Sequence, residues 1–596
     1  MLIISSASLP VYCANKAYAM KKSLVLFCPL LFGTFSMVLF KNAEQPVAQL
    51  VNEVKASTVI SCGPGTEEND AAPDGKFITL MPGWGNHFYR VSTQNDSAQV
   101  YFNQGLSMYY SYHAREAIAS FKEAARFDSG CAMAYWGQAL AMGPGYNGGF
   151  NYKMKPAVPA VLEAMNRVAT TASSKEKELI AAMNQRYDVT DSADKQRKVL
   201  NIAYTDALKP LVAKYPDDLD IKALYVDAVM LLHSWDFWWN DGTPKQWTPQ
   251  LVQYCKDILD KDPHHPAALH YYIHVTEASR NPQVALSSAD SLIKLFPGIA
   301  HMVHMSSHEY ERIGYYVKGV IANEKADRSL FVYDSLAKGM FPRLHIPHYY
   351  AVDAYCALSG AMYKKGLQKS LALRGLVQPE KGDYYDQYLY VFPQLAMVRM
   401  GKWQQILQDT TSINSEWTYA GIFDDFAKGM AYIKTGNLSM AKTHLTQLRE
   451  KEKDEALKKK FYPLAPSSNT PYHSAEVAEN ILLANILFTE KKKAEAVTAL
   501  EKAIVIEDSL LYEEPKIWML PARQWLGAFY LQWKEPGRAE KIYREDLVWN
   551  PGNGWSLLGL YQALKAQGKT AELKSLEKRF KVSFSEAEEI PISSAY

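Results

Sequence analysis

Apolar residues recur every three to four positions from about residue 96 to the C-terminus. This spacing places them along one face of an α-helix, and polar residues occupy the other faces. The preceding residues 41–95 are instead rich in Pro, Gly and Asn, with turn signals such as Pro73-Asp74-Gly75. The pattern predicts an all-α chain that follows a linker or irregular cap at residues 41–95.

The helical part is built from repeats of about 34 residues. A tetratricopeptide (TPR) unit needs small residues at positions 8, 20 and 27, where its two helices cross, and a large apolar residue near position 24. These slots are filled in units near both ends of the helical region, by Gly105, Ala117, Phe121 and Ala124, and by Ala484, Ala496, Leu500 and Ala503. In a further unit Gly527 and Ala539 fill positions 8 and 20, and Pro551 stands at position 32, where Pro is frequent. We therefore expect a TPR solenoid, a right-handed superhelix of antiparallel helix pairs. Its N-terminal array should span residues 96–385, and its C-terminal array and cap residues 386–596.

The N-terminal residues 1–40 carry a targeting signal. Lys21 and Lys22 precede an apolar run over residues 23–40, which is typical of an export signal. The run is long enough to be either a cleaved signal peptide or a retained membrane anchor. Since residues 1–19 lack a basic start, translation is expected to begin at Met20. We predict an extracytoplasmic protein, periplasmic, secreted or membrane-tethered, whose only membrane contact would be this anchor.

The overall charge argues against a nucleic-acid partner. The chain has 65 basic and 63 acidic side chains, a net charge of +2, and no dense basic run that could follow a phosphate backbone. Four cysteines follow the export segment, and their wide spacing matches no zinc ribbon or CxxC motif. Cys255 and Cys356 are expected to be buried apolar residues, whereas the disulfide state of Cys62 and Cys131 stays open.

Histidines are concentrated in the middle of the chain, and their phase follows the repeat. Nine of the fourteen lie between His264 and His348. If one unit begins at residue 266 and the next at residue 300, His270 and His274 take positions 5 and 9 of the first, and His301, His304 and His308 take positions 2, 5 and 9 of the second. These positions of the inner helix point into the concave face of a TPR superhelix.

This arrangement predicts a metal site in a histidine-lined groove. The expected ligands are His270, His274, His304 and His308, and several imidazoles brought together from helices suit a transition metal such as Cu, Zn or Fe. The sequence does not choose among these metals. Because Arg312 stands where a zinc protease would have the second histidine of HExxH, that mechanism is excluded.

Further side chains are expected around the same groove. Glu277 and Glu311 both fall at position 12, where a carboxylate could bind a metal, orient an imidazole or act as a general base. Arg312 could hold an anion, and the aromatic loop 234–242 could cover the groove or fill a gap between helices. The predicted groove residues are Trp235, Tyr271, His301, Glu311, Arg312, His345 and His348.

Two other functions fit the same residues. One is a metal-free protein-interaction scaffold that binds a protein or peptide in the groove, which is a common use of this fold. The other is a metalloenzyme in which Glu277 or Glu311 acts as the base and the metal activates water or oxygen. Some of the histidines could also simply pack between helices.

Several blocks of the sequence resemble a bacterial family of exported TPR proteins. The chain is similar to that family in the segments Tyr101–Leu106 and Ala132–Gly137, and in the histidine blocks His270-Tyr-Tyr-Ile-His274 and His304-Met-x-Ser-His308. Ser306 stands where the family usually has Pro. The resemblance covers about residues 80–370, and it implies the TPR fold but no particular activity.

Overall fold

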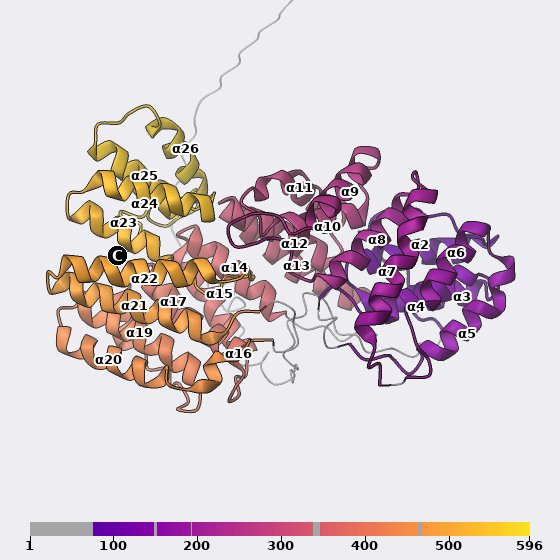
Figure 1. Ribbon diagram of the computed structural model, residues 1–596, viewed down its shortest axis with the longest axis horizontal. Helices are drawn as coiled ribbons and strands as arrows, with labels where there is room; N and C mark the ends of the chain where they lie inside the picture. The colour runs from indigo at the N-terminus through magenta and orange to yellow at the C-terminus, as the bar shows by residue number, and fades with distance from the viewer. Residues whose placement is uncertain (1–74, 148–151, 192, 338–345, 463–467) are drawn as a thin grey trace, which may run out of the picture. The chain divides into compact units, whose positions relative to one another are not determined.

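The computed structural model describes residues 75–147, 152–191, 193–337, 346–462 and 468–596, all within one compact unit (Figure 1). This part of the chain is helical and contains no β-strand, only an isolated bridge between Trp238 and Pro244. The predicted export segment, the first part of the linker, Cys62 and His345 lie outside the described residues. Within them, no helix is both long enough and apolar enough to span a membrane.

The first part of the fold contains the helices on which the histidines lie. It comprises α2 (Asp96–Tyr110), α3 (Ala114–Phe127), α4 (Ala132–Met142), α5 (Val158–Val168), α6 (Ser174–Asn184), α7 (Arg197–Lys214), α8 (Leu219–Leu232), α9 (Thr248–Lys261), α10 (Pro266–Thr276), α11 (Leu286–Leu295), α12 (Ala300–Arg312) and α13 (Tyr316–Ala337). Short 3-10 turns cover Ala169–Thr171 and Pro282–Ala285. The inner helices α10 and α12 begin at the repeat starts predicted from the histidine phase.

The second part continues with antiparallel pairs. It comprises α14 (Pro347–Ser359), α15 (Tyr363–Leu376), α16 (Tyr384–Tyr390), α17 (Phe392–Arg399), α18 (Trp403–Gln408), α19 (Thr418–Lys434), α20 (Leu438–Lys451), α21 (Pro471–Thr489), α22 (Lys493–Ser509), α23 (Ala522–Gln532), α24 (Pro536–Trp549), α25 (Gly554–Ala566) and α26 (Leu573–Ser583), with a 3-10 turn at Glu455–Lys458. The fold is therefore the predicted all-α TPR-type helical repeat.

One turn geometry joins the two helices of many units. The residue after the cap of the first helix has a left-handed backbone, with φ between +57° and +88°, at Tyr112, Gly314, Ala361, Gly401, Gly436, Lys491, Lys534 and Gly568. In each case the following N–H donates to the carbonyl five residues earlier, as from His113 to Met108 and from Tyr315 to Tyr310. This bond satisfies a carbonyl that the helix end would otherwise leave unpaired. Gly is favoured at such a position because it has no Cβ, yet half of these turns use another residue.

Close helix crossings depend on an aromatic ring held between two glycines. A Cβ atom on Gly105 or Gly137 would lie 2.8 or 2.4 Å from the ring of Phe121. The same arrangement recurs near the C-terminus, where a Cβ on Gly527 or Gly559 would lie 2.4 or 2.2 Å from Tyr543. The small and large positions that predicted the repeat are thus the positions at which neighbouring helices touch.

Residues 75–95 cover one edge of the N-terminal helices without forming a helix of their own. Their apolar side chains, including Ile78 and Trp84, are buried in the first hydrophobic core. Their backbone is held by side chains of the helices, since the Met81 N–H donates to the amide oxygen of Gln104 at 2.9 Å. The segment also meets the loop before α12, where the Gly298 N–H donates to the Gly83 carbonyl at 3.0 Å.

Three cysteines are buried free thiols, namely Cys131, Cys255 and Cys356. Cys255 and Cys356 are fully buried on helices, as the sequence predicted. Burial in apolar surroundings raises the pKa of the Cys131 thiol to about 11, so this thiol stays protonated and poorly reactive.

Replacing Gly137 by Ala should destabilise the protein, because the added methyl group would overlap the Phe121 ring between two helices. We expect the free energy of unfolding to fall by about 1–3 kcal/mol, the usual cost of overpacking. The control Gly375→Ala lies on an exposed part of α15 with open space around the added atom, and it should raise stability by up to about 1 kcal/mol. Urea unfolding measures both changes, and equal effects would contradict the packing role of Gly137.

Candidate metal centre

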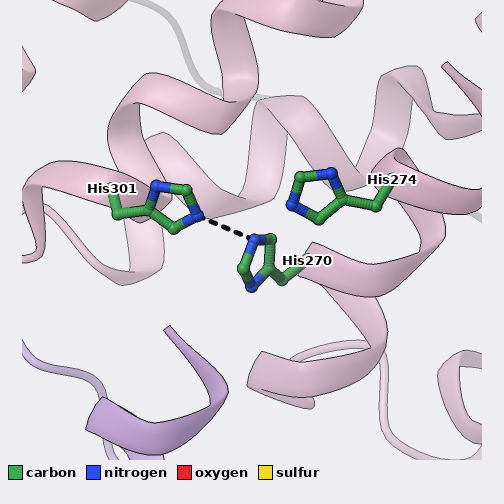
Figure 2. Close-up of side chains that lie close together, drawn as sticks. All are labelled: His270, His274 and His301. Atoms are coloured by element: carbon green, nitrogen blue, oxygen red, sulfur yellow. Dashed lines mark hydrogen bonds between the residues drawn. The ribbon is translucent and has the colours of Figure 1, made fainter. Parts of the chain in front are cut away.

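Six histidines lie in two groups of three on neighbouring helices. The first triad contains His270 and His274 from α10 and His301 from α12, which Figure 2 shows facing one another. The second triad contains His304 and His308 from α12 and His348 from α14. Within each triad one nitrogen of every imidazole lies within 4.8 Å of the other two. The four ligands predicted for one site therefore divide between two groups, and each group gains one of the predicted groove histidines.

In the first triad, hydrogen bonds at Nδ1 leave the Nε2 atoms directed inward. His270 Nδ1 lies 2.7 Å from the Tyr110 carbonyl oxygen, which can only accept, so Nδ1 carries the proton. His274 Nδ1 is bound in the same way to the Glu277 carboxylate at 3.0 Å. The His301 and His270 Nε2 atoms are 3.0 Å apart, so the proton between them belongs to His301. The buried His274 Nε2 has no hydrogen-bond partner among the described residues.

The second triad is oriented by an amide and two carboxylates. His304 Nδ1 donates to Asn323 Oδ1 at 2.6 Å, and this amide is fixed because its Nδ2 donates to the Gly319 carbonyl. His308 Nδ1 lies 3.0 Å from Glu277 Oε2 and 2.7 Å from Glu514 Oε2. The Nε2 atoms of His304 and His308 are 2.8 Å apart.

His348 completes the second triad from α14. Its ring centroid lies 4.9 Å from that of His304 and 5.7 Å from that of His308. Within the described part of the chain neither of its ring nitrogens has a hydrogen-bond partner, although the side chain is buried. Each triad therefore contains a buried imidazole with at least one nitrogen that the described residues do not satisfy, which is costly unless another group binds there.

The Glu277 carboxylate connects the two triads. It lies just after α10, and its two oxygens accept hydrogen bonds from His274 and His308, one on each inner helix. Of the three roles that the sequence left open for Glu277, the geometry favours the orienting one. A carboxylate that holds the outer nitrogen of an imidazole fixes the ring and increases its basicity as a ligand.

Burial keeps most of these imidazoles neutral. It lowers the pKa of His274 and of His348 to about 3, and it lowers those of His270, His301 and His304 well below the usual value. His308 differs: burial opposes its charge, but Glu514 and Glu277 raise its pKa well above the usual value. Neutral imidazole is the form that binds metal, so five of the six rings need no net loss of a proton at neutral pH, although His301 must move its proton from Nε2 to Nδ1. His308 must release a proton.

The nitrogen separations can be compared with those around a bound ion. Metal–nitrogen bonds of about 2.0 Å in a tetrahedral site place the nitrogens roughly 3.3 Å apart. The Nε2 atoms of His270 and His301, 3.0 Å apart, and those of His304 and His308, 2.8 Å apart, are already close to this spacing. The third imidazole of each triad lies within 4.8 Å, so a rotation that moves its nitrogen by about an ångström would complete the set.

Tyr112 covers the first triad. Its ring centroid lies 4.4, 5.7 and 5.5 Å from those of His270, His274 and His301. The residue occupies the left-handed turn between α2 and α3, with φ of 57°. Repeat spacing gave no sign of this contact, because Tyr112 belongs to a unit far from the histidines in sequence. Glu514 was missed for the same reason, whereas Asn323 lies at position 24 of the same unit as His304, where the repeat pattern predicts a large apolar residue.

The histidines are buried and do not line an open groove, which corrects the expectation of an exposed concave surface. Each of the six side chains is at most 4% exposed. Arg312 is also buried and donates to the carbonyls of Glu277 and Ser279 at 2.9 and 3.0 Å. Burial raises the pKa of Glu311 to about 7. The physical reason is that the turn at Tyr112, the aromatic loop and the segment before α23 cover the inner helices.

Two other predicted groove residues lie at the edges of this region. Tyr271 is fully buried on α10, where its ring stacks near Tyr112 at 5.9 Å. Trp235 lies farther out, its backbone N–H donating to the Tyr146 hydroxyl at 3.2 Å. Since the Tyr146 ring in turn lies 4.9 Å from that of His274, the aromatic loop reaches the first triad through Tyr146.

A third cluster surrounds the buried Asp220 carboxylate on α8. It accepts hydrogen bonds from His87 Nε2 and from the Tyr110 hydroxyl, both at 2.8 Å, and His265 Nε2 lies 3.7 Å away. Because the carbonyl of the same Tyr110 binds His270, this cluster supports the first triad from behind. The cluster attaches residues 75–95 to the helices, so its role is structural.

Comparisons with known proteins add no evidence about what this chain does. No protein-family model and no curated protein sequence matches the chain. Similar solved structures include a human IFIT1 dimer with PPP-AAAA (11% identity, TM-score 0.31, covering 80% of this chain and 94% of that one), the APC/C heterotetramer Cut9–Hcn1 (12%, 0.27, 82% and 78%) and yeast Tom70 (12%, 0.24, 82% and 93%). Similarity at this level carries no argument about function.

The His87–Asp220 pair should make stability depend on pH. Burial opposes the charge of His87, but Asp220 raises its pKa above 6.5 in the folded protein. The pair therefore contributes stability that is fully present below pH 6.5 and is lost as the pH rises through the folded-state pKa. We expect His87→Gln to lower the melting temperature most at pH 5–6 and least at pH 9, whereas His264→Gln, an exposed loop residue, should have no such trend. If His87→Gln lowered the melting temperature by the same amount at every pH, the charged His87–Asp220 pair would be contradicted.

Proposed function

We propose that this protein binds two transition-metal ions, one at each histidine triad. The observation that carries the proposal is the pattern of hydrogen bonds: outer nitrogens of four imidazoles are held by protein acceptors, while the inner nitrogens converge. This is the pattern by which metal-binding histidines are oriented in proteins. Three ring nitrogens without a hydrogen-bond partner in the described chain support it, namely His274 Nε2 in one triad and both nitrogens of His348 in the other.

The donor set favours zinc or copper over harder metals. Three neutral imidazoles with one open position form a common zinc site, and imidazole also suits copper. Iron would be expected to take a carboxylate as well, and Glu277 is engaged with the outer nitrogens of His274 and His308. We place Zn²⁺ and Cu²⁺ first among the metals that the sequence suggested, and Fe after them.

The two sites would be coupled through the protein. His301 and His304 belong to different triads on the same helix, and their ring centroids are only 6.2 Å apart. Glu277 holds one imidazole of each triad. Loading one site changes the charge and position of a group that orients the other, so the two ions should not bind independently. The predicted export would give this metal-binding protein an extracytoplasmic location.

Binding of a protein partner stays an alternative function, since helical repeats present extended surfaces that suit protein ligands. The inner faces of α10 and α12 are buried, however. A partner would therefore have to use other surfaces of the solenoid than the predicted histidine groove. Catalysis at the metal also stays a hypothesis, with Glu311 the better base because Glu277 is held by two imidazoles.

Elemental analysis of protein purified without a His-tag and loaded with Zn²⁺ or Cu²⁺ should give two ions per chain. The double variant His270→Gln with His301→Gln should retain one ion, and so should His304→Gln with His348→Gln. His473→Gln with His264→Gln removes as many imidazoles outside both triads and should retain two. Circular dichroism must show that each variant remains helical. Two ions in every folded variant would refute the assignment.

The orienting residues should affect affinity without removing ligands. Glu277→Gln should weaken binding at both sites about 10- to 100-fold, as is usual when the group behind a metal-binding histidine is lost. Asn323→Ala should weaken the second site more than the first, because Asn323 holds His304 alone. Competition with a chromophoric chelator measures both affinities. An unchanged second site in Asn323→Ala would contradict the orientation described for His304.

A further inference from the structure

A cavity of 560 Å³ lies beside the histidine triads, between the aromatic loop and the segment that leads into α23. Its wall includes Arg280 and Arg312 near the ends of α10 and α12, residues 235, 236 and 238–240 of the loop, and residues 510–513 and 516–518. Its volume falls within the range of about 300–1,000 Å³ that is typical of small-molecule sites. It adjoins the metal centre through Arg312, which is hydrogen-bonded to the backbone of Glu277.

Three cations of this wall have neutral partners only. Arg280 donates to the Asn240 carbonyl and lies 3.6 Å from the ring centroid of Trp549, Arg312 donates to two backbone carbonyls, and Lys516 donates to the Asn550 side chain. None of the three takes part in an ion pair in the ranges that the structure describes. The other cations of the wall are paired: Arg523 with Asp508 through two bonds of 2.6 and 2.7 Å, and Lys245 with Asp236.

The acidic side chains of the wall are directed elsewhere. Glu513 accepts from the Asn469 side chain at 2.8 Å, and Glu507 accepts from the Ala522 N–H at 2.8 Å. Burial raises the pKa of each of these carboxyls to about 7, so their negative charge is incomplete at neutral pH. Burial, together with the neighbouring cations, lowers the pKa of Lys516 to about 8 and that of Arg280 to about 10. The wall thus contains five cations and four carboxylates, and three of the cations form no direct ion pair in the described part of the chain.

The rest of the wall is aromatic and flat. It contains Trp235, Trp238, Trp239, Tyr512, Trp518 and Trp549. Trp238 is fixed in place because its indole N–H donates to the Val275 carbonyl at 2.8 Å. Trp239 is 58% exposed and lies at the solvent side. Such surfaces favour a planar apolar group through stacking and burial.

From these contacts we infer that the cavity binds a small organic acid, whose carboxylate or phosphate is held by Arg280, Arg312 and Lys516 and whose planar body lies against the tryptophans. Guanidinium groups suit this role because their N–H groups match both oxygens of a carboxylate or phosphate. The anionic group would supply the charge that the wall lacks. This site is separate from the histidine triads and does not depend on metal binding.

Calorimetric titration of the full chain with 2-naphthoate and with 2-naphthyl phosphate tests the inference, and 2-naphthylmethanol serves as the neutral ligand. We expect both acids to bind and the alcohol to bind at least 10-fold more weakly; the tighter acid identifies whether carboxylate or phosphate is preferred. Inorganic phosphate alone should bind more weakly than naphthyl phosphate. Failure of both acids to bind, or equal binding of the alcohol, would overturn the inference.

Two variants test whether the cations without an ion pair hold the acid. Arg280→Gln should weaken binding of the preferred acid at least 10-fold, whereas Lys245→Gln, which removes a paired cation of the same wall, should change it less than 2-fold. Arg312→Gln should also weaken binding, but Arg280 is the primary test because it is only half-buried and its replacement is less disruptive. Equal effects of Arg280→Gln and Lys245→Gln would overturn the role of the unpaired cations.

The same titration of the His270→Gln, His301→Gln variant separates this site from the metal centre. The acid should bind to this variant within 2-fold of the unmodified chain. If the acid binds while no metal does, the cavity stands and the proposed metal function fails. If two metal ions bind while no acid does, the proposed metal function stands and the proposed acid-binding cavity fails.

Discussion

The middle of this structure depends on the need of every buried imidazole for a hydrogen-bond acceptor. A ring removed from water loses its solvent partners, and an unpaired polar nitrogen in the interior costs free energy. The protein supplies these acceptors from distant segments: a carbonyl at the end of α2, an amide from α13, a carboxylate after α10 and another before α23. The buried histidines therefore require these four segments of the chain to pack around them.

Neutral imidazoles and unpaired cations lie next to each other in this region. Glu277 gives its two side-chain oxygens to His274 and His308 and its backbone carbonyl to Arg312. One residue thus connects the proposed metal centre with the proposed acid-binding cavity. An organic acid in the cavity would therefore lie close to the proposed metal centre, although the two sites use different side chains.

The sequence predicted the helices and the histidine phase because both follow from local periodicity. The repeat starts at residues 266 and 300 place His270, His274, His304 and His308 on inner helices, and the structure has α10 and α12 there. The turn residues were harder to recognise, because Tyr112, Ala361, Lys491 and Lys534 occupy a backbone position at which Gly is expected. A backbone geometry that several residue types tolerate leaves no reliable sequence pattern.

The partners of the histidines could not be predicted in the same way. Tyr112 and Glu514 meet the triads through long-range packing, and no spacing within one repeat relates them to positions 5 and 9. Asn323 lies in the same repeat as His304, but at position 24, where the pattern predicts a large apolar residue. Periodicity also cannot distinguish an open groove from a covered one. The division of four expected ligands into two triads follows from the approach of α14, which brings His348 to His304 and leaves His301 to α10.

The contact between His308 and Glu514 has a consequence for biosynthesis. A ribosome completes α10 and α12 long before it makes the segment that follows α22, so the nascent protein holds His308 without one of its two carboxylate partners. His308 can contact both of its carboxylate partners only after the segment that follows α22 has been translated and has packed against the histidine region. Maturation of the centre is therefore a late event, and a chain terminated before α22 would expose an incomplete centre to water.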